Sequence, residues 1–135
     1  MKLIKRTVAL LFALVVAGTA AIPSLADEPL LRNGGLEEMK KLNEKKAGIL
    51  YGYLDNSKMF RGTVVPKDRS LMNVPFVTGD EELDKKFVKA AEAEGFVNLK
   101  GHRSVGGMRA SIYNAMPVEG VEKLCDFIQK FDREH

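Results

Sequence analysis

Residues 101–117 of the chain read GHRSVGGMRASIYNAMP, and this segment decides the expected fold. Apolar and polar residues alternate in its second half, which predicts a strand over residues 108–113. Arg109 and Ser111 then lie on one face of that strand. The other face carries the apolar side chains Met108, Ala110 and Ile112. Pro117 suits the first position of a following helix, so the segment links a one-sided strand to a helix that can cover it.

The first half of the segment has the composition of an anion-binding loop. It holds His102 and Arg103 among glycines, and Arg109 follows in the strand. Arginine offers a planar fork of donors that matches carboxylate or phosphate oxygens in pairs, and glycine lets the backbone approach a ligand. These residues predict a site for a small, doubly anionic ligand. A basic surface loop between two strands has the same composition, and residue types alone do not separate the two interpretations.

Upstream, the sequence predicts a helix, a loop and a strand. Apolar residues recur at helical spacing over residues 36–53, with charged residues between them, which indicates an amphipathic helix. The residues expected near its apolar face are Leu36, Met39, Leu42, Asn43, Ile49, Leu50 and Tyr53. Residues 61–68 form the expected loop, and residues 70–77 form the expected strand. Pro75 lacks a donor for a strand ladder and therefore indicates an edge strand or the end of a strand.

A second helix and a short strand are expected before the glycine-rich segment. The pattern from Thr78 to Glu81 matches a capping box and opens a helix to about residue 94, which Gly95 ends. Residues 96–99 are expected to form a strand. The inward side chains of the last helix are Val118, Val121, Leu124, Cys125, Ile128 and Phe131. This order predicts an α+β fold, a small sheet of about three strands with helices packed on one face.

The charge of the chain does not favour nucleic-acid binding. The formal net charge of +3 comes from Lys2, Lys5 and Arg6, because residues 1–26 contain no acidic residue. The chain has 21 basic residues, and without these three, 18 remain against 18 acidic ones. Nucleic-acid binding normally needs a net basic surface, so we expect no such partner.

The first 26 residues have the pattern of a secretory signal peptide. A basic start is followed by an apolar run over residues 8–22 and by small residues before Asp27, where cleavage is expected. The run is shorter than a membrane-spanning helix, so we expect no permanent membrane anchor. Residues 27–33 are an expected linker and residues 34–135 the expected domain. The alternative is an accidental hydrophobic leader joined to a cytoplasmic sequence.

Cysteine and histidine are too few for a disulfide framework or a metal cluster. Cys125 is the single cysteine and lies on the apolar stripe of the last helix, which favours a core role over a nucleophile. The two histidines, His102 and His135, are far apart in sequence. We therefore expect no metal site.

Several segments from about residue 33 onward match one known family together: Asn33-Gly34-Gly35, Leu42-Asn43, Lys46-Ala47, Leu50-Tyr51, Asp55-Asn56-Ser57, Arg69-Ser70, Met72-Asn73-Val74-Pro75-Phe76, Leu83-Asp84-Lys85-Lys86-Phe87 and residues 99–117. Through them, the sequence resembles the C-terminal small domain of phosphoserine aminotransferase, a class V, pyridoxal-phosphate-dependent family of the aspartate-aminotransferase fold. The resemblance covers about three quarters of the chain and continues into the last helix.

The resemblance implies a transaminase of serine biosynthesis. Its reaction passes an amino group from glutamate to 3-phosphohydroxypyruvate, giving O-phosphoserine and 2-oxoglutarate, and some bacteria use a related phosphorylated substrate to make pyridoxal phosphate. The family is implied to be cytoplasmic and homodimeric. By matching residues, His102 and Arg103 correspond to groups that hold the substrate phosphate, and Arg109 corresponds to the arginine that holds the α-carboxylate.

The sequence departs from the family in the cofactor-binding part. No lysine stands in a context that resembles the one that forms the Schiff base, and Lys100 beside the loop is expected to be solvated. We therefore expect no catalytic residue here, no pyridoxal phosphate bound by this chain alone, and no turnover by it. Two alternatives stay open. One is an exported, non-enzymatic module that binds a small anion through the same side chains, and the other is a gene fragment or fusion product without independent function, whose exposed apolar surface favours association.

Overall fold

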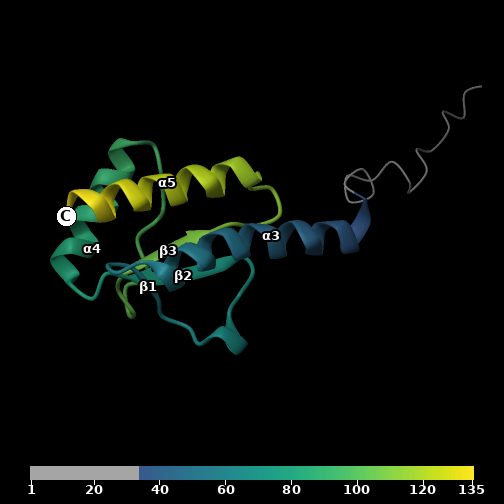
Figure 1. Ribbon diagram of the computed structural model, residues 1–135, viewed down its shortest axis with the longest axis horizontal. Coiled ribbons are helices and arrows are strands. Elements are labelled where there is room, and N and C mark those ends of the chain that lie inside the picture. The colour runs from purple at the N-terminus through teal and green to yellow at the C-terminus, as the bar shows by residue number, and fades with distance from the viewer. Residues whose placement is uncertain (1–33) are drawn as a thin grey trace, which may run out of the picture. The chain divides into compact units, whose positions relative to one another are not determined.

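Three helices pack on one face of a three-stranded antiparallel sheet (Figure 1). This is a computed structural model, and it describes residues 34–135, so the expected leader and linker lie outside the described residues. The elements are α3 (Gly35–Asn56), β1 (Arg61–Gly62), the 3₁₀ helix η2 (Pro66–Asp68), β2 (Asn73–Val77), α4 (Glu81–Ala93), β3 (Met108–Ser111) and α5 (Val118–Glu134). The expected α+β class is confirmed. No helix among these has both the length and the apolar composition of a membrane span.

The sheet has one buried face and one open face. In the β2–β3 pairing, Val74 lies opposite Ala110 and Phe76 opposite Met108, and all four side chains are buried. Arg109, on the other face of β3, is exposed. The expected alternation in this strand is therefore confirmed. Because all three helices contribute to the core above the buried face, the side chains of the second face remain accessible within the described residues.

The core centres on Phe87 of α4. Its ring centroid lies 5.0 Å from that of Phe60, 6.0 Å from that of Phe76 and 5.2 Å from that of Phe131, in edge-to-face geometry in all three pairs. Such aromatic contacts add to the free energy gained by burial itself. The expected inward positions of α5 are confirmed for Val121, Leu124, Ile128 and Phe131, while Val118 and Cys125 are only partly buried. In α3, Leu36 is exposed, against the expected pattern.

The expectation that Pro75 marks an edge or an end of a strand is wrong, because β2 is the middle strand. The carbonyl of Pro75 accepts a hydrogen bond from the N–H of Thr63 (3.2 Å), so the nitrogen of Pro75 faces the same side, toward β1. β1 pairs only through Arg61 and Gly62 and ends before that position. The missing donor therefore removes no hydrogen bond between β2 and β3.

The strand expected over residues 96–99 is also wrong. Asn98 has φ = 61°, a left-handed conformation that interrupts an extended run. Only Lys100 forms an isolated antiparallel bridge, with Met108. The segment thus approaches β3 at its end without forming a strand.

The helix ends follow the expected chemistry with shifts of one or two residues. The carboxylate of Asp80, not the side chain of Thr78, caps α4 by accepting from the N–H groups of Glu82 and Leu83. The hydroxyl of Thr78 instead donates to Asp84. Gly95 ends α4 as expected, with φ = 89° and the doubled backbone hydrogen bonds of a Schellman motif. Pro117 is the residue before α5 rather than its first residue.

Candidate functional site

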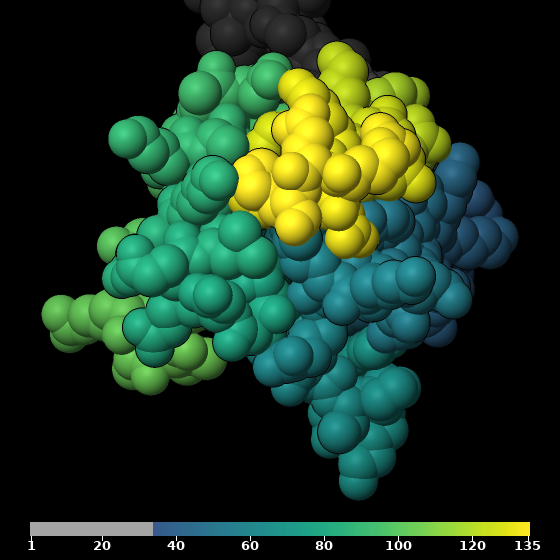
Figure 2. All heavy atoms as spheres, turned by 60° about the vertical axis from the view of Figure 1, so that its left-hand side comes forward, coloured from purple at the N-terminus to yellow at the C-terminus, as the bar shows by residue number. Residues whose placement is uncertain are grey.

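The glycine-rich segment forms a closed loop beside β3. The N–H of Gly101 donates to the carbonyl of Gly107 (2.8 Å), and the N–H of Arg109 donates to the carbonyl of Leu99 (2.7 Å). Residues 99–101 therefore run antiparallel to residues 107–109. Inside the loop, the N–H groups of residues 105 and 106 both donate to the carbonyl of His102, at 2.9 Å and 2.8 Å. The loop (bright green) projects from the molecular surface (Figure 2).

Two glycines allow this closure. A Cβ atom on Gly101 would lie 2.0 Å from the carbonyl oxygen of Gly106, a backbone atom that the loop itself holds in place. Gly107 has φ = 63°, and a Cβ atom there would lie 2.5 Å from Cγ1 of Val77. Both positions need glycine, which has no side chain and tolerates positive φ. The loop conformation therefore depends on glycine at these two positions.

The structure brings the three predicted site residues into one region. His102 and Arg103 lie in the projecting loop, and Arg109 lies two residues beyond the end of that loop, on the open face of the sheet. All three are exposed. Within residues 34–135, no carboxylate lies within ion-pair distance of either arginine. The two positive charges, one in the loop and one in the strand that follows it, are therefore available to an anion.

The ring of His102 is held within the loop by Ser104. Nδ1 of His102 lies 2.7 Å from the hydroxyl oxygen of Ser104 and also accepts a hydrogen bond from the N–H of Ser104 (3.3 Å). Within the described residues, Nε2 makes no hydrogen bond. One ring nitrogen is therefore occupied by the loop and the other remains available.

At the end of β3 opposite the loop, α3 supports the chain that leaves the strand, a feature that the sequence analysis missed. Lys46 is fully buried, and its ammonium group donates to the carbonyls of Ile112 (3.2 Å), Tyr113 (2.6 Å) and Met116 (3.0 Å). One turn earlier, the amide of Asn43 donates to the side chain of Asn114 (2.7 Å). Burial lowers the pKa of Lys46. The signal was present, because Lys46 falls at helical spacing from Met39, Asn43 and Leu50.

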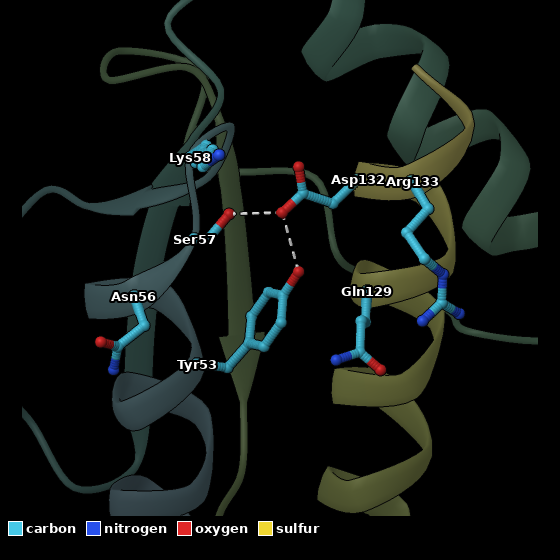
Figure 3. A pocket seen from close by; sticks show the side chains of 7 residues that line it. All are labelled: Tyr53, Asn56, Ser57, Lys58, Gln129, Asp132 and Arg133. Atoms are coloured by element: carbon cyan, nitrogen blue, oxygen red, sulfur yellow. Dashed lines mark hydrogen bonds between the residues drawn. The ribbon is translucent and has the colours of Figure 1, made fainter.

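A separate pocket of about 480 Å³ lies between the end of α3 and the end of α5 (Figure 3). The carboxylate of Asp132 accepts hydrogen bonds there from the hydroxyls of Tyr53 (2.9 Å) and Ser57 (2.8 Å). Burial and the hydrogen bond to Asp132 raise the pKa of Tyr53 to about 12. None of the predicted site residues lines this pocket. It is a second polar region, distinct from the loop.

Potential metal ligands and the single cysteine carry no further site here. Within residues 34–135, no three side chains of His, Cys, Asp or Glu gather as a metal cluster would require. Cys125 is half-buried, and burial raises the pKa of its thiol to about 11. A thiol with so high a pKa is a poor nucleophile at neutral pH.

The fold and the loop belong to a known class of proteins. The chain is a member of the class-V aminotransferase family, whose family profile matches residues 15–124. That range begins inside the stretch interpreted above as a leader.

Among curated proteins, the chain is similar to phosphoserine aminotransferases. It is 57% identical over 110 residues to the one from Listeria monocytogenes serovar 1/2a, covering 82% of this chain and 30% of that protein. It is 55% identical over 105 residues to the one from Limosilactobacillus fermentum, covering 78% and 29%. The chain therefore spans about 30% of the length of these relatives.

Solved structures give the same result. The phosphoserine aminotransferase from Bacillus circulans subsp. alkalophilus has a TM-score of 0.76 and 52% identity, covering 78% of this chain and 29% of that one. A phosphoserine aminotransferase from Trichomonas vaginalis with bound PLP has a TM-score of 0.70 and 39% identity, covering 74% and 29%. These matches agree with the α+β arrangement described above.

Proposed function

We propose that this chain supplies the substrate-binding part of a phosphoserine transaminase, which converts 3-phosphohydroxypyruvate and glutamate to O-phosphoserine and 2-oxoglutarate. One observation carries the proposal. In a chain 57% identical to a phosphoserine aminotransferase, two exposed arginines without a carboxylate partner among the described residues stand on one glycine-closed loop and the strand beside it.

In this proposal the loop and the strand each bind one anionic group of the substrate. His102 and Arg103 bind the phosphate, because a projecting loop with two donor side chains can surround a group that has several oxygens. Arg109 binds the α-carboxylate, for which a planar guanidinium fork is the best match. The strand fixes the backbone of Arg109 through pairing with β2 and the hydrogen bond to Leu99.

Pyridoxal phosphate, which the family resemblance implies, would supply the electron sink for transamination. The described lysines do not fit a Schiff-base role. Lys46 is the single buried lysine of residues 34–135, and its ammonium group is already bonded to three carbonyls. The other described lysines, including Lys100, are exposed. We therefore propose that this chain binds substrate and does not catalyse turnover alone. Glutamate-dependent turnover by the purified chain with added pyridoxal phosphate would contradict that.

Amide NMR titrations of the ¹⁵N-labelled full chain test the binding proposal. O-phosphoserine should shift amides of residues 102–107 and of Arg109. In Arg109→Ala, the response to serine, which lacks the phosphate, should disappear, while the response of the loop to inorganic phosphate should remain. Arg133→Ala is the matched control, because Arg133 is an exposed arginine of α5 that lines the other pocket. Identical responses in wild type and Arg109→Ala, or no response in wild type, would refute the proposed site.

We also propose that the transaminase acts as a cytoplasmic homodimer, as the family resemblance implies. The exported, non-enzymatic module is the alternative. N-terminal sequencing of the protein from its native cells separates them, because an exported chain should begin at Asp27. An unprocessed N-terminus in the cytosol favours the transaminase.

A further inference from the structure

Ser104 makes two contacts with the same nitrogen of His102. Its hydroxyl oxygen lies 2.7 Å from Nδ1, and its backbone N–H donates to Nδ1 at 3.3 Å. A backbone N–H can only donate, so Nδ1 must offer a lone pair to it. In a neutral imidazole, one nitrogen carries the proton and the other accepts. The contact therefore selects the tautomer that carries its proton on Nε2.

We propose that Ser104 is a positioning residue that holds His102 in the Nε2–H tautomer, so that the histidine presents a donor to the substrate phosphate. The inference rests on the proposed function for the identity of the anion, and on the loop geometry for the tautomer. The opposite tautomer would present a lone pair at Nε2, which repels a phosphate oxygen. Ser104 thus determines whether the histidine attracts or repels the anion.

The fold of the loop makes this contact possible. The N–H groups of residues 105 and 106 donate to the carbonyl of His102, which closes a turn and places the N–H of Ser104 beside the ring. The backbone hydrogen bond between Gly101 and Gly107 closes the loop, so the inner turn does not depend on the hydroxyl of Ser104. Removing the hydroxyl should therefore leave the backbone in place, so that only the 3.3 Å contact from the N–H of residue 104 still favours the Nε2–H tautomer.

The molecule contains its own reference for the tautomer. Nδ1 of His135 lies 3.1 Å from the carbonyl oxygen of Phe131, and a carbonyl can only accept. His135 should therefore carry its proton on Nδ1, the opposite of His102. Its ring also stacks on Phe131, with centroids 4.1 Å apart, far from the loop in sequence. Substitutions at Ser104 should leave the signals of His135 unchanged.

Long-range ¹H–¹⁵N spectra of the full chain, recorded at about pH 8, where ordinary imidazoles are neutral, identify which nitrogen carries each proton. Wild type should show His102 as the Nε2–H tautomer. Ser104→Ala keeps the backbone N–H at 3.3 Å from Nδ1 and loses only the hydroxyl at 2.7 Å, so a minor Nδ1–H population should appear beside the Nε2–H form. Ser104→Thr, which keeps the hydroxyl, should show no such population. Titration with inorganic phosphate should show binding weakened in proportion to the lost Nε2–H population, by up to about 2-fold for an even mixture, and recovery for Ser104→Thr.

The outcomes separate this inference from the proposed function. A wild-type His102 with its proton on Nδ1, or an unchanged tautomer and unchanged phosphate binding in Ser104→Ala, would overturn the role of Ser104. Failure of inorganic phosphate to bind wild type would overturn the proposed anion site. In that case the tautomer spectra still decide whether Ser104 positions the ring.

Discussion

Replacing Lys46 with methionine should cost a large part of the stability of the fold. Methionine keeps an unbranched, apolar chain in the buried space but offers no donors to the carbonyls of Ile112, Tyr113 and Met116. A buried acceptor left without a partner costs about 1–3 kcal/mol. Burial lowers the pKa of Lys46, so part of this loss is offset because the variant no longer buries a charge. We expect a net loss of about 1–3 kcal/mol, because the hydrogen bond to the carbonyl of Ile112 is buried whereas those to the carbonyls of Tyr113 and Met116 are only partly buried.

Urea unfolding of the full chain, followed by circular dichroism, measures this loss. With a slope of about 1–3 kcal/mol per molar urea, the midpoint should fall by roughly 0.3–3 M. Lys45→Met is the matched control, because Lys45 is the exposed neighbour on the same helix, and it should change stability by less than about 0.5 kcal/mol. A loss below about 1 kcal/mol in Lys46→Met, with an unchanged slope, would refute the reasoning, because the three carbonyls would then be satisfied by water.

Two further predictions concern the loop and the thiol. Gly101→Ala should destabilise the chain by about 1–3 kcal/mol and weaken the phosphate response of the loop, because the new Cβ would overlap the carbonyl of Gly106. Gly48→Ala on α3, with open space around it, should instead stabilise the chain by about 0.5–1 kcal/mol. Urea unfolding measures both changes, and equal effects of the two substitutions would contradict the geometry. The pKa of Cys125 is raised to about 11 from an ordinary 9.0, so at pH 8 its thiol should react with an aromatic disulfide reagent about 100-fold more slowly in the folded chain than in the urea-unfolded chain. Equal rates in the two states would contradict the burial of this thiol. The stability that the protonated thiol contributes should be present below pH 9 and lost between about pH 9 and 11.

The parts of this fold that follow a period could be predicted from the sequence. The alternation around Arg109 and the helical spacing of Val121, Leu124 and Ile128 each describe one buried face, and the structure buries those faces. The residue that caps α4 could not be predicted in the same way. Two residues between strand and helix, Thr78 and Asp80, both have side chains that can cap, and the choice between them depends on Asp84, whose carboxylate binds Thr78 instead.

The candidate site likewise has one part that the sequence predicts and another that it does not. The cationic side chains could be proposed from the sequence, because the binding chemistry of arginine, histidine and glycine follows from the residue type alone. Their support could not, because it depends on contacts across the fold: Lys46 lies 66 residues from Ile112, whose carbonyl it binds. The sequence analysis assigned no role to this lysine at an apolar helical position, although its three donors suit a bend whose carbonyls have lost their strand partners. The chain that leaves β3 turns toward α5 at this point, and its carbonyls need donors from outside the sheet. A buried lysine is therefore what this turn requires, and its position on α3 links the helix to the strand that carries Arg109.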